Sequence, residues 1–488
     1  EIRASDWSSD VCSSDLNMVF ELLLFLIQGK ELPKYPPKYH FRGTWNIPYW
    51  QIKQPFSVQM DLVNGRSVEN TFNGYQIAVH EVNKIKASRQ VYSKDGEKKE
   101  YCIFNEINNE NDKLIKYIPD SNEQWDYKGV KVVLGKKCDY WESNEKQPNN
   151  YWFYRFYADQ ETGMPVRYHQ RGKSIRGSHP TDYYLDFEEF GPSIDEFQFI
   201  IPADCRNMTQ PNGPQMAKDI HLTKRAIRQD KDYTFVPLTQ DKCQNVTDVP
   251  DVTSLPKEFS WRDFPNVVPK VRDQANCGSC WAQSATEAIS SQFSMIYNKQ
   301  VTVSAQQMVD CTWDDEKVNN ACDGGEGYAG YGLLAKKNIT ITTEEEYPYI
   351  GVGGYCPSAS YENVLGYVTD CKQFVPQEHD PNHTLLKKAL YKYGPLMISI
   401  RAGIDSFVSL SRDYPYHDDA ELCNVNTWES NNIDHGVLLT GWKIHNGKSY
   451  LEIMNSWSTF WGEDGFGYIS EENDCGIESM VLLPVVKV

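Results

Sequence analysis

The chain has 488 residues and a formal net charge of −18 at pH 7. Because domains commonly contain about 100 to 200 residues, we expect a chain of this length to fold as more than one domain. The acidic balance argues against a phosphate-binding surface, and therefore against nucleic acid as a partner.

Two segments near the start of the chain are not expected to belong to the folded domains. Residues 8–15 form a near repeat of small and acidic residues, which indicates an artefactual extension over 1–17 with Met18 as the start. The apolar run 22–27 is too short for a membrane span, which needs about 20 residues, but suits the core of a signal peptide. We therefore expect a signal peptide over 18–30 and no transmembrane segment.

Cysteine content and glycosylation signals indicate the compartment. The chain has 13 cysteines and several Asn-x-Ser/Thr sites, which are more typical of an oxidising secretory route than of the cytosol. We expect a lysosomal or endosomal, granule or extracellular location. The candidate glycosylation sites are Asn207, Asn245, Asn338 and Asn382.

Residues 40–205 have the pattern of an antiparallel β domain. The segment is rich in aromatic and β-branched residues, and turn signals such as 94–96 and 159–163 separate its runs. Alternation along 151–157 indicates one sheltered face, as in a half-barrel or curved sheet. A steric cover or folding aid for the rest of the chain is the favoured role, and a concave face that holds a lipid-type ligand is the alternative.

Residues 206–254 have the composition of a linker or propeptide. They combine polar residues, prolines and two of the glycosylation signals with one helical stretch around 216–228. Exposed segments of this kind are preferred sites of proteolysis, so we expect processing here.

The strongest chemical signal is the motif Gln-Ala-Asn-Cys-Gly-Ser-Cys-Trp-Ala over 274–282. Apolar residues recur at helical spacing after Cys280, so this cysteine should lie in the first turn of a buried helix. A helix N-terminus and an imidazolium partner both lower the pKa of a thiol from about 8.5 and make it a nucleophile. The competing interpretation, a buried or disulfide-bonded cysteine, must also explain His435 within 432–438 and Asn455 within 454–462, which follow in order.

Together these motifs resemble those of the papain-like cysteine peptidases, the cathepsin family. The resemblance covers about 256–488 and implies an α+β fold with a helical left lobe and a β-barrel-like right lobe, so that a peptidase domain over 255–488 follows the antiparallel β domain. It implies that Cys280 is the nucleophile, that His435 is its acid and base, and that Asn455 orients His435. Gln274, six residues before Cys280, would donate to the oxyanion together with the backbone N–H of Cys280.

The same resemblance implies a set of substrate-binding residues. Gly324 and Gly325 would pair with an extended substrate backbone, and Trp457 would wall the leaving-group side. The pocket for the P2 side chain would be apolar, which predicts a preference for apolar or aromatic P2 residues. Glu326 is expected to be a solvated acid at the rim. The expected lining residues of this pocket are Gly327, Ser399, Ile433, Gly436 and Met480.

The resemblance also implies a disulfide framework in the peptidase domain. The implied pairs are Cys277 with Cys322, Cys311 with Cys356, and Cys423 with Cys475. Cys371 is left over and is either free or bridged to the N-terminal region, whereas Cys102, Cys138, Cys205 and Cys243 are candidates for two further bridges.

The N-terminal half departs from the pattern of most relatives. The residues before Leu255 lack the spaced pattern of a helical inhibitory propeptide, which leaves the β domain as the candidate cover. The motifs 41–49 and 322–326 are most similar to those of the insect two-chain haemocyte cysteine proteases. That resemblance implies that an N-terminal chain stays with the catalytic chain after processing.

Three functions are weighed. The favoured one is a secreted or lysosomal cysteine endopeptidase, made as a zymogen, that acts on polypeptides. The alternatives are a dipeptidyl exopeptidase of the cathepsin C type, and a catalytically idle structural or ligand-binding protein. We expect no metal and no cofactor, because Cys277 and Cys280 would need two more ligands at suitable spacing to hold zinc.

Overall fold

The computed structural model describes most of the chain. The described residues are 30–94, 97–109, 111–119, 123–176, 179–201, 205, 243–313, 319–357, 360–376, 382–418, 433–472 and 475–488. The expected extension over 1–17, nearly all of the signal peptide, Asn207 and the segment 206–242 therefore lie outside the described residues.

The N-terminal domain is one open antiparallel sheet, as the sequence predicts. The strand order is β6-β5-β4-β3-β2-β1-β11-β10-β9-β8-β7, so two meanders join where β1 pairs with β11. Its strands are β1 (Lys38–Ile47), β2 (Ile52–Asp61), β3 (Arg66–Thr71), β4 (Gln76–Glu81), β5 (Ile85–Lys94), β6 (Glu97–Glu106), β7 (Asp126–Val133), β8 (Lys136–Lys146), β9 (Tyr151–Asp159), β10 (Pro165–Lys173) and β11 (Pro180–Gly191).

Strand β1 explains why this sheet has a sheltered face. Its buried and less buried residues alternate along the strand, which places Tyr39, Phe41 and Trp45 on one side. A bulge in the pairing with β11 lies between Arg42 and Gly43. At Gly43 a Cβ atom would lie 2.2 Å from the carbonyl oxygen of Asp186, so only glycine fits there.

The sheltered face is filled by the chain itself. Tyr117, which lies between β6 and β7 in the sequence, has no exposed surface, and its ring contacts those of Phe41 and Phe56 with centroids 5.5 and 5.2 Å away. Trp45 packs on the same ring. Aromatic pairs of this geometry stabilise a core beyond the area they bury. This packing argues against the alternative of an open lipid-type pocket on this face.

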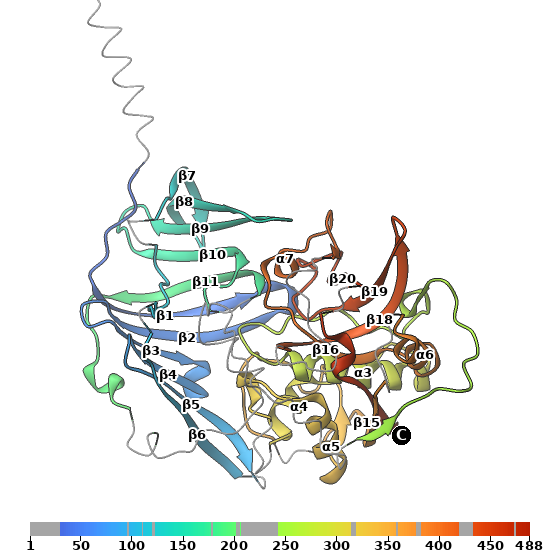
Figure 1. The fold of residues 1–488 in the computed structure, drawn as a ribbon. Coiled ribbons are helices and arrows are strands. Elements are labelled where there is room, and N and C mark those ends of the chain that lie inside the picture. Colours follow the sequence, from blue (N-terminus) through green and yellow to red (C-terminus); the bar gives the residue numbers. More distant parts are fainter. Residues whose placement is uncertain are drawn as a thin grey trace, which may run out of the picture.

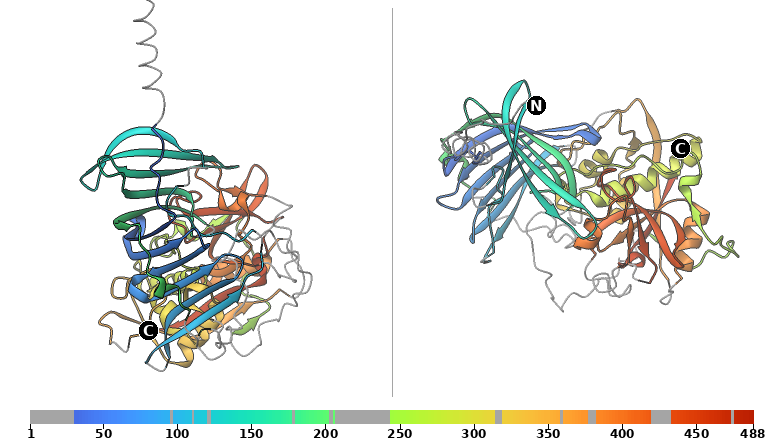
Figure 2. Two further views of the ribbon diagram at one scale, coloured as in Figure 1. Left: turned by 90° about the vertical axis from the view of Figure 1, so that its left-hand side faces the viewer. Right: turned by 90° about the horizontal axis from the view of Figure 1, so that it is seen from above.

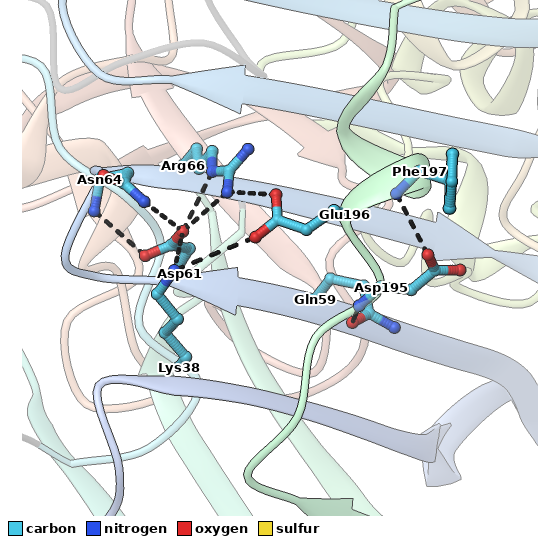
Figure 3. A network of polar contacts seen from close by, with 8 residues as sticks. All are labelled: Lys38, Gln59, Asp61, Asn64, Arg66, Asp195, Glu196 and Phe197. Atoms are coloured by element: carbon cyan, nitrogen blue, oxygen red, sulfur yellow. Dashed lines mark hydrogen bonds and ion pairs between the residues drawn. The ribbon is translucent and has the colours of Figure 1, made fainter.

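An ion network closes the C-terminal end of the domain onto the sheet (Figure 3). The carboxylate of Asp61 is fully buried and accepts hydrogen bonds from Asn64 and Arg66, and the Lys38 ammonium lies 3.0 Å from it. Arg66 also binds Glu196, 2.6 Å away, in the segment that follows β11. The network therefore ties that segment to β2 and β3.

The N-terminal disulfides differ from the expected pairing. Cys102 on β6 is bonded to Cys205, whereas Cys138 is a buried free thiol. Cys243 is bonded to Cys371 and not to a cysteine of the β domain. The expectation of two bridges among Cys102, Cys138, Cys205 and Cys243 is therefore wrong, because the fold buries Cys138 apart from the others.

The peptidase domain is a mixed α+β unit. The helices are α3 (Cys280–Tyr297), α4 (Ala305–Cys311), α5 (Gly327–Lys336), α6 (Thr384–Tyr393) and α7 (Asp405–Val408). The strands are β12 (Gln244–Val246), β13 (Phe259–Ser260), β14 (Thr340–Thr342), β15 (Val364–Phe374), β16 (Leu396–Ile400), β17 (Tyr416–His417), β18 (His435–His445), β19 (Lys448–Met454), β20 (Phe466–Ser470) and β21 (Val481–Lys487). The sheet order is β12-β15-β21-β16-β18-β19-β20-β17, with β13 on β18 and β14 on β15.

The segment 243–254, which the sequence assigns to the linker, packs on this domain. Strand β12 runs parallel to β15, and the Cys243–Cys371 disulfide joins them. Val249 and Val252 are buried in the same core. The described part of the peptidase unit therefore begins at Cys243, and the expectation of a linker over 206–254 does not hold for 243–254.

The two domains lie side by side, with the ends of β1 and β2 directed at the peptidase domain (Figures 1 and 2). The connection between these strands makes the contact. Tyr49 donates to the carbonyl oxygen of Val271 at 3.0 Å, and the Trp50 indole donates to Glu344 at 3.2 Å. Gln54 donates to the carbonyl oxygen of Gly351 at 2.8 Å. Among the described residues, no helix is long and apolar enough to cross a membrane.

Candidate active site

Helix α3 positions Cys280 as its first residue. The Cys277–Cys322 disulfide holds the preceding loop, and Tyr349 donates to the carbonyl oxygen of Gln274 at 2.8 Å. The Cys280 thiol is free and only 4 % exposed. A thiol at this place lies at the positive end of the helix dipole, as the sequence predicts.

His435 begins strand β18 and is brought to Cys280 by the packing of that strand on α3. A Cβ atom added at the next residue, Gly436, would lie 3.2 Å from the carbonyl oxygen of Cys280, so the strand touches the start of the helix. The Nε2 atom of His435 lies 2.8 Å from Oδ1 of Asn455. Because that oxygen accepts, Nε2 carries the hydrogen and Nδ1 is left with a lone pair for the thiol proton.

Trp457 covers this pair. Its indole lies against the His435 ring, with centroids 4.6 Å apart. The indole N–H donates to Oε1 of Gln274 at 3.2 Å, and the Ser456 hydroxyl donates to the same oxygen at 2.9 Å. The Nε2 of Gln274 therefore points the other way and donates to the carbonyl oxygen of Cys277 at 3.0 Å. The amide hydrogens of Gln274 face the loop that carries Cys280.

Burial favours the neutral forms of both Cys280 and His435. It raises the pKa of the Cys280 thiol to about 12, although backbone N–H groups of Gly436 and Trp281 act in the opposite direction. It lowers the pKa of His435 to about 4, although the hydrogen bond with Asn455 opposes this. A thiolate and imidazolium pair needs solvation or strong donors, so the site as folded here holds a thiol and a neutral imidazole.

The expected substrate-binding glycines lie beside the helix of the nucleophile. A Cβ atom at Gly325 would lie 2.7 Å from the ring of Trp281, and one at Gly327 would lie 2.0 Å from the sulfur of Met397. Gly324 has a φ of 102°, which favours glycine. At Gly325 and Gly327 the protein itself fills the space where a side chain would lie. The expected substrate-pairing strand is not formed here, because residues 324–326 lie outside the strands and Gly327 begins helix α5.

The other expected pocket residues come from the opposite lobe. The Ser399 hydroxyl lies 3.6 Å from the sulfur of Met480, and Ser399 pairs with Gly436 across β16 and β18. Ile433 lies just before β18. These residues therefore share one region next to His435.

Glu326 differs from the expectation of a solvated rim residue. It is only 5 % exposed, and its Oε2 atom has no hydrogen-bond partner among the described residues. Burial raises the pKa of its carboxyl to about 8. No local pattern indicates this burial, because Glu326 lies among glycines and only the packing of the left lobe covers it.

Two of the three disulfides that the resemblance implies are present in this domain. The structure contains the Cys277–Cys322 and Cys311–Cys356 disulfides that the resemblance implies. Cys475 is disulfide-bonded, and its expected partner Cys423 lies outside the described residues. Asn245, Asn338 and Asn382 are exposed. The described residues contain no group of three or more His, Cys, Asp or Glu that could hold a metal ion.

Residues from the β domain reach the same site, and sequence reasoning did not find them. The ring of His179 stacks on Trp457, with centroids 5.5 Å apart and planes at 11°. The Nε2–H of His179 donates to the carbonyl oxygen of Ala275 at 2.9 Å. These partners are far apart in the sequence, so no local pattern could have joined them.

A helix-borne thiol, a strand-borne imidazole and an amide that orients the imidazole define the class, a cysteine peptidase. The profile of the Papain family cysteine protease matches residues 255–485. A viral cathepsin of Adoxophyes honmai nucleopolyhedrovirus is 31% identical over 271 residues, which cover 54% of this chain and 74% of the viral protein. The chain therefore belongs to the papain family of cysteine proteases, and polypeptides are its substrates.

Further proteins are similar to this chain. A cathepsin L-like peptidase of Aedes aegypti is 34% identical over 243 residues, which cover 49% of this chain and 66% of the relative. Among solved structures, digestive procathepsin L2 from the larval midgut of Tenebrio molitor is 26% identical with a TM-score of 0.44, and the match covers 60% of this chain and 83% of that one. The profile match begins at residue 255, after the β domain.

Proposed function

We propose that this protein is a cysteine endopeptidase that cleaves peptide bonds through an acyl-enzyme on Cys280. The observation that carries the proposal is the 2.8 Å contact between His435 and Asn455 at the start of the strand that abuts Cys280. This contact fixes the tautomer in which Nδ1 of His435 can accept the thiol proton.

The reaction follows from the arrangement of these groups. Nδ1 of His435 takes the proton of Cys280, and the thiolate attacks the scissile carbonyl carbon. The oxyanion that forms is stabilised by the backbone N–H of Cys280 and the side-chain amide of Gln274. His435 then gives its proton to the leaving amine, which departs and leaves a thioester. Water, deprotonated by His435, attacks the thioester, so that a carboxylic acid leaves and the thiol is restored.

The P2 pocket should prefer apolar or aromatic side chains. Its expected lining, Gly327, Ser399, Ile433, Gly436 and Met480, contains no charged group. Glu326 lies next to this lining, and the pKa of about 8 keeps its carboxyl protonated at acid and neutral pH. A buried neutral carboxyl does not attract a basic side chain, so the apolar preference holds over this range.

The alternatives are less well supported. A dipeptidyl exopeptidase of the cathepsin C type would need the β domain to bind the amine end of the substrate, whereas His179 of that domain lies against Trp457 on the side of the leaving group. A catalytically idle protein would have no reason to hold His435, Asn455 and Gln274 in these hydrogen bonds. We place the protein in the secretory pathway, in lysosomes, granules or the extracellular space, with the β domain retained on the catalytic chain after processing.

The test is hydrolysis of a blocked Phe-Arg fluorogenic peptide at about pH 5. At this pH an imidazole that has taken the thiol proton remains protonated. Hydrolysis should vanish in Cys280→Ala and titrate with an epoxide thiol inhibitor in a 1:1 ratio, while unblocked dipeptide substrates should give no advantage. Strong preference for an unblocked N-terminus would favour the exopeptidase. Absence of hydrolysis and of labelling at Cys280 in every form of the protein would favour the idle protein.

A further inference from the structure

We propose that Ser174 and His179, which flank the connection between β10 and β11, form a plug that occupies the leaving-group side of the catalytic cleft and blocks peptide cleavage until this hairpin undocks from the peptidase domain. This inference rests on the proposed function, because it assigns the latency of that same site to named residues.

The position of the plug follows from the chemistry of the leaving group. The departing amine must come within hydrogen-bond reach of the His435 ring, which protonates it. The indole of Trp457 borders that space, since it lies 4.6 Å from the His435 ring. His179 stacks on this indole, with ring centroids 5.5 Å apart. The side chain of a substrate residue after the scissile bond would have to take the place of His179.

The plug is fixed to the loop before the nucleophile. His179 donates to the carbonyl oxygen of Ala275 at 2.9 Å, and the Ser174 hydroxyl donates to the side-chain oxygen of Asn276 at 2.9 Å. Tyr183, on β11, donates from its hydroxyl to Asp273. All of these side chains are buried, so the contacts exclude water. Asp273, Ala275 and Asn276, in the segment just before Cys277, are therefore all engaged by one hairpin.

The β10–β11 hairpin and the residues just before β9 also contact the opposite lobe of the peptidase domain. The guanidinium of Arg171 lies 4.9 Å from the ring centre of Phe460, and the Lys173 ammonium lies 3.7 Å from Asp405. The Ser411 hydroxyl donates to the carbonyl oxygen of Asn149, which lies just before β9, at 2.8 Å. Because 273–276 and these residues belong to different parts of the peptidase domain, the β domain bridges the two walls of the cleft.

The consequence for the site is loss of access. His435 is 2 % exposed and Trp457 is 4 % exposed, and Cys280 is equally buried. Peptide cannot reach the thiol while the plug is in place. The neutral thiol and neutral imidazole of this state agree with a site from which water has been removed.

The contacts of the plug suit a reversible cover. They consist of hydroxyls, an imidazole, amides and exposed ion pairs, all of which water can solvate once they separate. Each of the four disulfides between described cysteines lies within 30–205 or within 243–488. Movement of the β domain therefore breaks none of these disulfides, although it exposes Trp152, which is buried in one cluster with residues of the peptidase domain.

The experiment uses the full chain, checked as uncleaved on a gel before and after the assay. Alkylation of Cys280 by iodoacetamide and hydrolysis of a blocked Phe-Arg peptide are compared among wild type, His179→Ala and Tyr183→Phe. His40→Ala is the matched control, because His40 is a partly exposed histidine of β1 that contacts Glu189 and Ser193 within the β domain. We expect His179→Ala to raise both rates about tenfold, equivalent to about 1.4 kcal/mol of lost docking free energy, and His40→Ala to leave them unchanged.

The outcomes separate the two proposals. If uncleaved wild type and His179→Ala are alkylated at equal rates, the plug is wrong. If His179→Ala does not fold, Tyr183→Phe replaces it in the test, because this variant keeps the ring and removes only the hydroxyl that binds Asp273. An alkylation rate of Tyr183→Phe within error of the wild-type rate would then overturn the plug. If alkylation rises in the variants but no form hydrolyses peptides, the plug stands as a cover of the thiol and the proposed endopeptidase function fails.

Discussion

Cys243 and Cys371 form a disulfide that fastens the segment before the peptidase domain to strand β15. The segment 243–254 therefore remains on the catalytic chain wherever the linker is cut. By contrast, the disulfide of the β domain, Cys102–Cys205, is internal. Retention of the β domain after cleavage between 206 and 242 would thus depend on non-covalent contacts.

We expect the chains that result from such a cut to co-elute on gel filtration and to separate on a non-reducing denaturing gel. Polar contacts such as Gln54 with Gly351 hold the domains together in buffer but not in detergent. The control is the uncut chain, which should migrate as one species under both conditions. A single high-mass band for the cut protein without reductant would show a covalent link and contradict this prediction.

Replacement of Gln274 tests the oxyanion role. Gln274→Ala should lower kcat/KM of the active enzyme by about 10²- to 10³-fold, because one preorganised donor to the oxyanion is lost. Gln274→Glu should be nearly as damaging, since it keeps an acceptor for Trp457 but removes the donor. Gln300→Ala, at an exposed glutamine, serves as the control. A loss confined to KM would instead indicate a role in ground-state binding.

The plug should respond to pH through His179. Burial lowers the pKa of docked His179 below its ordinary 6.5, so the undocked imidazole binds a proton more tightly. As pH falls through about 6.5, protonation favours undocking. Two neighbouring groups also titrate. Burial raises the pKa of Asp273 to about 6, so protonation of Asp273 at lower pH favours the docked state. His435 stays neutral above about pH 4.

The measurement that isolates His179 is the alkylation rate of Cys280 in uncleaved wild type divided by that in His179→Gln. The Asp273 contribution is common to both proteins and cancels. We expect this ratio to rise as pH is lowered from about 7.5 to about 5.5. A ratio that stays constant would show that His179 does not carry the pH response.

Glu326 should control P2 selectivity only at high pH. Because burial raises its pKa to about 8, Glu326→Gln should leave the ratio of kcat/KM for Phe and Arg at P2 unchanged at about pH 5.5. At about pH 9 the wild-type carboxylate should favour Arg several-fold more than the variant does. Glu345→Gln, at an exposed glutamate, is the control. Arg preference at pH 5.5 that disappears in Glu326→Gln would mean that the carboxyl is ionised there.

The stability of the β domain should depend on Asp61. Burial opposes ionisation of this carboxyl, but hydrogen bonds from Asn64, Lys38 and Arg66 outweigh it and hold its pKa well below the ordinary value. Asp61→Ala should lower the free energy of unfolding at pH 7 by about 2 to 4 kcal/mol, because Asn64 and the partly buried Arg66 and Lys38 lose their partner. Urea unfolding followed by tryptophan fluorescence measures this change.

The matched control is Glu196→Gln. Glu196 shares Arg66 with Asp61, but its side chain is 58% exposed, so the expected cost is below about 1 kcal/mol. Because the native pKa of Asp61 is depressed, its contribution is present above about pH 4 and is lost as pH falls through the native pKa. Equal costs for the two variants would show that burial of Asp61 adds nothing.

The sequence by itself predicted which residues meet at the site. Helical spacing after Cys280 predicted a helix start, which is a short-range signal. The resemblance to the papain-like peptidases implied the strand at His435 and the places of Asn455 and Gln274. Alternation of apolar residues determined the antiparallel β domain in the same way, because a sheet with one buried face needs a period of two. Both sets of features depend on neighbours in the chain.

Only the tertiary structure decided what covers the site. The stacking of His179 on Trp457, the partner of Cys371 and the burial of Glu326 each depend on contacts between segments far apart in the sequence. Local propensity carries no information about such contacts, since their free energy comes from desolvation and packing that exist only after those segments come together. For the same reason the role of the β domain follows from where its β10–β11 hairpin lies, and not from the composition of its strands.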